Sequence, residues 1–102
     1  MVLNVVRAKL FSAVKRVVDK HDPQRLLKLG APKDEYDPES GLVADAIMRE
    51  GPVGMHGLAR IFQVVFHYHF ASWTHDEMAD MTTYSPLVLD LWKTLPRSCR
   101  QG

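Results

Sequence analysis

The segment Asp22–Ser40, which reads DPQRLLKLGAPKDEYDPES, restricts the possible folds more than any other part of the chain. An Asp-Pro pair stands near each end of it, and a Gly-Ala-Pro sequence lies between them. Proline is tolerated in the first turn of a helix but not in its interior, and glycine favours the left-handed conformation in which many helices end. The segment therefore predicts a short helix that begins after Asp22 and ends at Gly30, and another that begins at Asp37.

Elsewhere, apolar residues repeat at intervals of three and four, which is the pattern of amphipathic helices. Thr74 and Glu77 have the spacing of a capping box, and Ser85-Pro86 marks a further helix start that Pro96 brings to an end. We expect helices over about residues 2–20, 38–50, 55–71 and 85–95, with a short one after Thr74. The expected buried faces are Leu3, Val6, Leu10, Val14 and Val17; Leu42, Val43, Ala46 and Ile47; Leu58, Ile61, Phe62, Val65 and His69; and Leu87, Val88, Leu91, Trp92 and Leu95.

Residues 58–70 are open to a second interpretation. The run IFQVVFHYHF is rich in β-branched and aromatic side chains, which also suit a β-strand. Polar residues nevertheless recur here at helical spacing, so a helix is favoured.

The fold class predicted from these patterns is all-α, a compact bundle of five or six short helices in a single domain of residues 1–102. A chain of 102 residues, 46% of them hydrophobic, can bury a core without disulfides. Cys99 is the single cysteine, so no intramolecular disulfide forms, and we expect its thiol to be exposed in a loose C-terminal tail at 97–102.

Charge is nearly balanced overall but unevenly distributed. The net charge of +1 argues against a protein built mainly to bind nucleic acid. Residues 1–20 carry five bases against one acid, whereas residues 21–50 carry seven acids against four bases. Either a basic helix lies beside an acidic segment and neutralises it, or the surface is split and orients a charged partner.

No stretch of the chain approaches the ~20 apolar residues that span a bilayer. The start MVLNVVRAKLF does not have the regions of a secretory signal peptide. We therefore expect a cytoplasmic protein without a membrane partner.

The sequence contains no recognisable catalytic or metal-binding motif, so we expect no cofactor, no metal and no assignable catalytic residue. His67 and His69 lie about 160° apart on a helix and cannot share an ion there, although on a strand they could. The acids around Asp34 lack the donor spacing of a calcium loop, because Pro38 interrupts it.

Two groups of residues remain as candidate ligand- or partner-binding sites. The first is a polar stripe on the central helix, His56, Arg60, Gln63 and His67, which is either an ordinary solvated face or the lining of a groove for an anion or an acidic partner. The second is the triplet Asp34, Glu35 and Tyr36, which no cap or turn rule requires. This triplet either clamps the loop, with Asp34 or Glu35 on a base of the first helix and the Tyr36 ring over an apolar face, or forms a binding site.

The segment Asp22–Ser40 also resembles the signature of a domain-of-unknown-function family of short all-α bacterial proteins, D-P-x-x-L-L-x-L-G-A-P-x-D-E-Y-D-x-E. The resemblance covers about a fifth of the chain. It implies a compact all-α fold, and it brings no activity or catalytic residues with it. The matching residues are Asp22, Pro23, Leu26, Leu27, Gly30, Ala31, Pro32, Asp34, Glu35, Tyr36, Asp37 and Glu39.

The function predicted from these observations is that of a small, non-enzymatic helical binding protein that associates with itself or with another protein. An immunity-type protein or an accessory protein of a mobile element fits this description by analogy. The alternative is a small-ligand-binding or enzymatic domain that uses the polar stripe or the Asp34–Tyr36 loop. The sequence leaves open whether the protein is an enzyme.

Overall fold

The structure, a computed structural model, confirms the all-α fold. It describes residues 2–23, 26–74, 84–95 and 99. These residues form four α-helices and no β-strand, so residues 58–70 are helical and the strand interpretation is wrong. The helices are α1 (Val2–His21), α2 (Asp37–Glu50), α3 (Met55–Thr74) and α4 (Ser85–Thr94).

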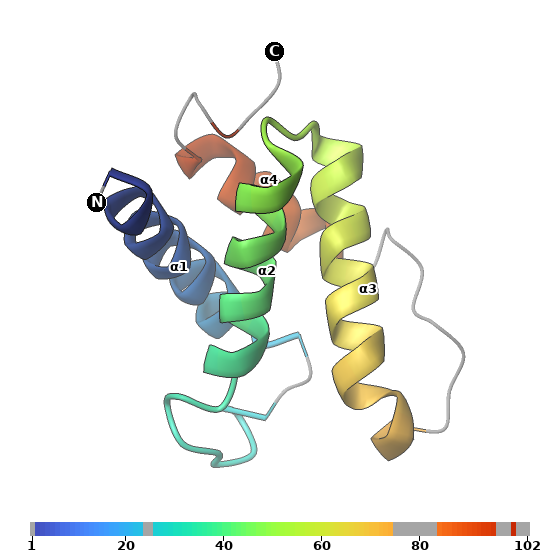
Figure 1. Ribbon diagram of the computed structural model, residues 1–102. Coiled ribbons are helices and arrows are strands. Elements are labelled where there is room, and N and C mark those ends of the chain that lie inside the picture. Colours follow the sequence, from blue (N-terminus) through green and yellow to red (C-terminus); the bar gives the residue numbers. More distant parts are fainter. Residues whose placement is uncertain (1, 24–25, 75–83, 96–98, 100–102) are drawn as a thin grey trace.

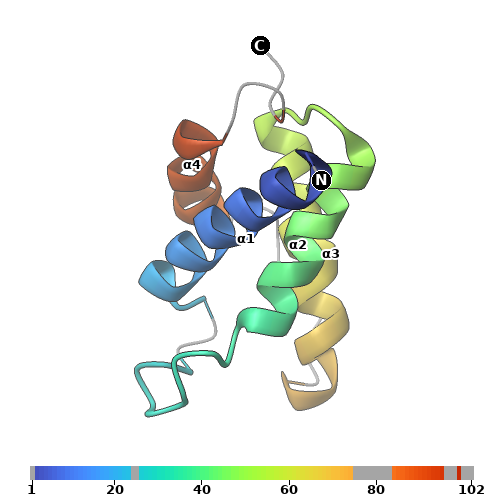
Figure 2. The ribbon, with the colours of Figure 1, turned by 60° about the vertical axis from the view of Figure 1, so that its left-hand side comes forward.

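The four helices pack so that each contacts two others. Helix α2 lies between α1 and α3, and α4 crosses behind it (Figure 1). Both α2 and α4 pack against α1 on one side and against α3 on the other. The view in Figure 2 shows α1 crossing the bundle with α4 on one side of it and α2 and α3 on the other. Helices α2 and α3 run in opposite directions because only a short turn, residues 51–54, joins them.

Side chains from all four helices meet in one hydrophobic core. Within it the rings of Phe62, Phe66 and Tyr84 pack against one another, with centroids 5.7–6.3 Å apart; Phe62 and Tyr84 are stacked, and Phe66 is tilted against both. The predicted buried faces are mostly correct, since Leu10, Val14 and Val17 of α1 are completely buried. Val6 of α1 and Trp92 of α4 are only partly buried, and the side chain of Leu3 lies outside the described part of the chain. The other buried core residues include Val43, Ala44, Ile47, Leu58, Leu87, Val88, Leu91 and Leu95.

Two predicted faces need correction. Leu42 was expected in the core, but it is 42% exposed because α2 turns Val43, Ala44 and Ile47 inward instead. In α3 the fully buried row is Leu58, Phe62 and Phe66, spaced by four residues, whereas Ile61 and Val65 are only partly buried. The side chain of His69 lies outside the described part of the chain.

The segment after α1 closes as a turn and not as a helix. Asp22 adopts a left-handed conformation (φ 46°), and its N–H donates to the carbonyl of Val18, so it ends α1 instead of beginning a new helix. Gly30 is left-handed as predicted (φ 98°). The bonds from Ala31 N to Leu26 O (2.9 Å) and from Gly30 N to Leu27 O (3.1 Å) form a Schellman closure. Among the described residues of this segment, 26–30 form a turn that uses the predicted stop signal and contain no α-helix.

The other predicted helix starts lie at Asp37 and after Thr74. Helix α2 begins at Asp37 with Pro38 in its first turn, as predicted, and Tyr36 occupies its N-cap position without a side-chain capping bond. Thr74 is the last residue of α3, and the capping box expected of Thr74 and Glu77 involves residues outside the described part of the chain. The short helix expected after Thr74 falls on residues 75–83, outside the described residues.

Cys99 is buried, contrary to the prediction of an exposed thiol. It is 6% exposed and belongs to the core cluster. Its carbonyl accepts a hydrogen bond of 3.1 Å from the N–H of Val53, in the turn between α2 and α3. The chain is therefore held against the bundle at this position, and the remainder of the tail lies outside the described residues.

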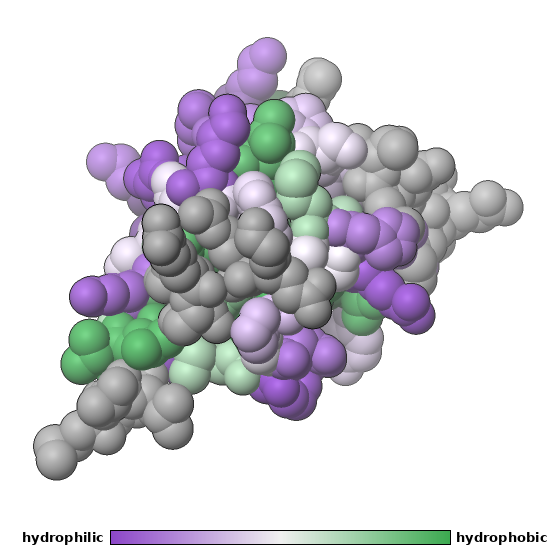
Figure 3. Space-filling model, turned by 90° about the horizontal axis from the view of Figure 1, so that it is seen from above, coloured by the Kyte–Doolittle hydropathy of each residue, from purple (hydrophilic) through white to green (hydrophobic). Residues whose placement is uncertain are grey.

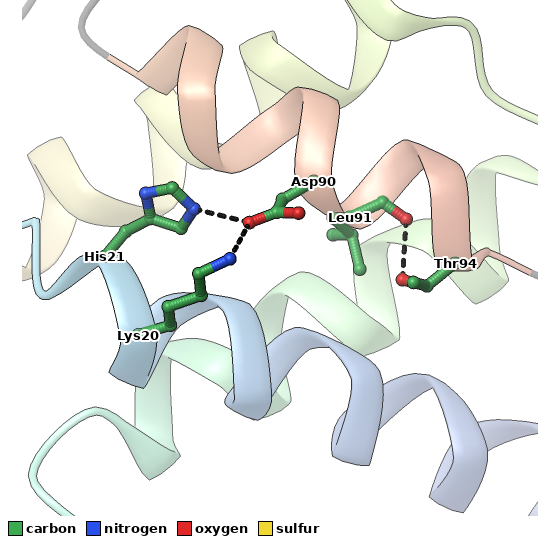
Figure 4. A network of polar contacts seen from close by, with 5 residues as sticks. All are labelled: Lys20, His21, Asp90, Leu91 and Thr94. Atoms are coloured by element: carbon green, nitrogen blue, oxygen red, sulfur yellow. Dashed lines mark hydrogen bonds and ion pairs between the residues drawn. The ribbon is translucent and has the colours of Figure 1, made fainter.

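A polar contact joins the end of α1 to α4 (Figure 4). Lys20 Nζ and His21 Nε2 both lie 2.8 Å from Oδ2 of Asp90. These two neighbours lower the pKa of Asp90 to about 2. Near the end of α4, the hydroxyl of Thr94 donates to the carbonyl of Leu91.

None of the helices in the described part of the chain combines the length and apolar character needed to cross a membrane.

Candidate functional site

The two candidate groups lie at opposite ends of α2. Asp34, Glu35 and Tyr36 directly precede its first residue, whereas the polar stripe begins at His56, just beyond the turn that follows its last residue. A helix of 14 residues is about 21 Å long. The two groups therefore do not form a common site.

Tyr36 is a core residue and not part of an accessible site. Its side chain is completely buried, and its ring packs against that of Phe66 with centroids 6.2 Å apart. Its hydroxyl donates a hydrogen bond of 2.6 Å to Oδ1 of Asp22 and accepts one of 3.3 Å from the N–H of Leu26. For this member of the triplet the geometry is that of a structural clamp.

A base of the first helix does hold this loop, but through a different acid. Lys15 Nζ lies 2.6 Å from Oδ1 of Asp37 and 3.1 Å from both Asp19 Oδ2 and the carbonyl of Lys33. The hydrogen bond to the Asp37 carboxylate is the main cause that raises the pKa of Lys15 above its usual value. The sequence predicted that Asp34 or Glu35 would pair with a base of the first helix, and the acid that does so is Asp37.

Asp34 and Glu35 are left without an ion pair to any described residue. The side chain of Asp34 is exposed and that of Glu35 is partly exposed. Their backbones close the loop, since Glu35 N donates to Pro32 O (3.1 Å) and Asp34 O accepts from Asp37 N (3.0 Å). We call these two residues the acidic end of α2.

The polar stripe of α3 is divided between two environments. His56 and Arg60 are exposed and line a hollow at the junction of α2 and α3. Gln63 and His67 are partly buried and do not line it. The stripe therefore does not act as one surface.

The hollow has a volume of about 710 Å³ and is open to solvent. Its walls come from the last turn of α2, the turn at 51–54 and the first half of α3. Arg49 and Glu50 lie on one side, opposite His56 and Arg60 on the other. The remaining lining residues are small or apolar: Ala46, Pro52, Val53, Gly54, Gly57, Ile61, Val64 and Val65.

The rim of this hollow has a basic excess. Neither Arg49 nor Arg60 forms an ion pair with a residue that the structure describes, and Glu50 is the single acid facing them. We call Arg49, His56 and Arg60 the basic end. Sequence reasoning missed Arg49, although the short turn at 51–54 was a usable signal, because it forces the last turn of α2 beside the first turn of α3.

Exposed apolar side chains also lie on α2 and α3. On α3, Val64 is 50% exposed and Tyr68 is 82% exposed, one turn apart. On α2, Leu42 stands four and seven residues before Ala46 and Arg49, which both line the hollow, so it shares their helix face. We call the surface formed by Leu42, Val64 and Tyr68, together with the basic end, the α2–α3 face.

The end of the molecule where α2 passes into α3 is visible in Figure 3, which looks down on it from above. Hydrophilic side chains project around its outline, and hydrophobic ones form separate patches between them. Over the described residues, no three His, Cys, Asp or Glu side chains are placed to hold a metal ion.

Comparison with known proteins gives no relative for this chain: no protein-family model, no curated protein and no solved structure matches it significantly.

Proposed function

We propose that this protein is a small, non-enzymatic helical binding protein that associates with a second copy of itself through the α2–α3 face. The observation that carries the proposal is the exposure of Tyr68 and Val64 on successive turns of α3. Large aromatic side chains with apolar neighbours are the usual anchors of protein interfaces. Leu42 extends the apolar surface onto the neighbouring helix.

A second copy is a suitable partner because a two-fold interface brings the same patch of both copies together. The apolar side chains of Leu42, Val64 and Tyr68 would then be covered by the same apolar surface of the second copy. The enzymatic alternative has less support, because its candidate groups lie at opposite ends of α2 and Tyr36 is buried.

The proposal is tested by sedimentation velocity over a range of protein concentrations. The wild type should sediment as a dimer at high concentration, and the double substitution Val64→Ser, Tyr68→Ser should shift it to monomer. The matched control is Val5→Ser, because Val5 is 55% exposed but lies on α1, outside the face. A wild type that remains monomeric throughout, or a double variant that still dimerises, would contradict the proposal.

The cellular role is a further part of this proposal. Membership of the domain-of-unknown-function family rests on residues 22–40, and a cytoplasmic immunity-type or mobile-element accessory role rests on analogy with other small helical proteins. The genes beside this one provide the test. An adjacent toxin or integrase gene would support the role, whereas a stable position inside a metabolic operon would argue against it.

A further inference from the structure

We infer that the hollow at the junction of α2 and α3 is a binding site for a small organic anion that carries an apolar group. Arg49 and Arg60 bind the anionic group, a carboxylate or a phosphate. The apolar lining, which includes Ile61 and Val65, covers the rest of the ligand. The site goes beyond the proposed self-association and does not depend on it, because residues of a single chain form the hollow.

The first observation is the size and lining of the hollow. Its volume is about 710 Å³, and its walls come from two helices and the turn that joins them. Pockets for small molecules have volumes of about 300–1,000 Å³ and combine apolar side chains with a few polar groups. Here the polar groups belong to Arg49, Glu50, His56 and Arg60, and every other described lining residue is small or apolar.

The second observation is the charge of the rim. Arg49 and Arg60 form no ion pair with a described residue, and neither does Glu50, so the one carboxylate on the rim does not hold either guanidinium group. Helix α2 ends and α3 begins at this hollow, so opposite ends of two helix dipoles meet there and offset each other. The side chains therefore decide the charge, and two guanidinium groups against one carboxylate leave a positive excess before any contribution from His56.

The third observation is that cationic and apolar side chains line the same hollow. Guanidinium groups bind carboxylates and phosphates with paired hydrogen bonds. Between exposed groups such bonds contribute little, because water screens the charges. A ligand whose apolar group covers Ile61 and Val65 displaces this water and strengthens the bonds to the arginines. The lining therefore favours an amphipathic anion over an inorganic ion and over an uncharged apolar molecule.

Gly57 leaves space in the hollow. It lies in the first turn of α3 and is one of the lining residues. Of the described atoms, a Cβ at this position would meet only the Cβ of Val53, at 4.0 Å. Val53 also lines the hollow, so a longer side chain at position 57 would take up space that the ligand needs. Since glycine is a poor helix former, such a substitution fills the hollow without weakening α3.

Calorimetric titration with four probes tests the class of ligand. The probes are octanoate, octyl phosphate, 1-octanol and acetate, each kept below the concentration at which it forms micelles or separates. Octanoate or octyl phosphate should bind at least about tenfold more tightly than 1-octanol and acetate, because only these two combine an anionic and an apolar group. The tighter of the two identifies the anionic group. If neither binds more tightly than 1-octanol and acetate do, the inference is wrong.

Substitutions test the location of the site. Arg49→Gln, Arg60→Gln should weaken binding of the tighter probe at least about tenfold. Gly57→Leu should abolish binding while it melts no lower than the wild type. The matched control is Arg16→Gln, Lys28→Gln, which removes two positive charges at exposed positions outside the hollow and should bind like the wild type. An equal loss in this control, or unchanged binding in Gly57→Leu, overturns the site.

Tyr68→Ser separates this site from the proposed self-association, because Tyr68 belongs to the α2–α3 face but does not line the hollow. The variant should dimerise more weakly. It should bind the probe at least as tightly as the wild type, since Val64 belongs to both surfaces. A monomeric wild type that binds octanoate disproves the proposed function and leaves the site. If the wild type dimerises and neither it nor Tyr68→Ser binds an amphipathic anion, the site is disproved and the proposed function stands.

Discussion

The hydroxyl of Tyr36 donates a hydrogen bond of 2.6 Å to Oδ1 of Asp22, and this bond joins the last residue before α2 to the residue that ends α1. The Asp22 carboxylate also accepts the N–H groups of Leu27 (3.1 Å) and Lys28 (2.9 Å). Burial acts to raise the pKa of Asp22, but the hydrogen bonds from Tyr36 and from these N–H groups outweigh it and lower the pKa. One carboxylate thus organises the whole connection between the two helices.

Replacement of Tyr36 by phenylalanine should therefore lower the free energy of unfolding by about 1–2 kcal/mol, since it removes a hydrogen bond to a charged group and keeps the ring. Urea unfolding monitored by circular dichroism measures the change. Tyr84→Phe is the matched control, because Tyr84 is also buried against Phe66 and none of the hydrogen bonds in the described structure involves its hydroxyl. An equal loss in both variants would show that the bond to Asp22 contributes nothing particular.

Gly30→Ala should destabilise the protein by about 1 kcal/mol, because Gly30 has φ 98° and an L-residue is strained there. No atom lies within 4 Å of the added Cβ, so the cost is conformational and not steric. Gly41→Ala is the control: the residue lies within α2, and its Cβ would make ordinary contacts with Arg7 and Phe11. That variant should gain about 0.5–1 kcal/mol from helix propensity. Thermal unfolding that ranked the two variants the other way would refute the left-handed closure.

Asp90 should give the protein part of its sensitivity to acid. Lys20 and His21 lower its pKa from 3.8 to about 2 in the folded state. Because the unfolded chain then binds the proton more tightly, this contribution to stability is complete above about pH 4 and is lost as the pH falls towards 2. At pH 5 the free energy of unfolding of Asp90→Asn should be lower than that of the wild type. Between pH 4 and pH 2 it should decline less steeply than that of the wild type.

The measurement for Asp90 is a series of urea unfolding curves between pH 2 and pH 5. Ser12→Ala is the control, since Ser12 is exposed on α1 and carries no charge. It should keep the slope of the wild type. The salt bridges of Asp90 are solvent-accessible, so added salt should reduce the difference between Asp90→Asn and wild type. An unchanged acid slope in Asp90→Asn would refute the assignment.

The triplet Asp34, Glu35 and Tyr36 shows how far local rules reach. These rules explained why Gly30 and Pro38 stand where they do, and they left the triplet unexplained. They did not show which of its three side chains is buried and which is exposed. The structure separates them, because Tyr36 is completely buried whereas Asp34 is exposed. Whether each of these side chains is buried depends on how the loop packs against α1 and α3. The residues of the loop alone do not determine this packing.

The ion pairs illustrate the same limit. A base on α1 was expected to hold the loop, and Lys15 does so, but its partner is Asp37. Both candidate acids and the correct one lie within four residues, so a small rotation at the start of α2 decides which carboxylate faces α1. Periodicity fixes a helix and its faces only to within such a rotation, which is also why Leu42 was wrongly placed in the core.

The sequence by itself determined the four helices of the described chain, most of their buried faces and the left-handed stop at Gly30, because these depend on spacing and on backbone preferences over a few residues. Only the tertiary structure decided that Asp22 ends α1, that Cys99 is buried, and that Arg49 joins His56 and Arg60 around one hollow. The burial of Cys99 and the position of Arg49 depend on contacts between segments far apart in the chain or across a turn, and Asp22 is also bound by the distant Tyr36. Such contacts are fixed by packing all the helices at once, and no local pattern records them.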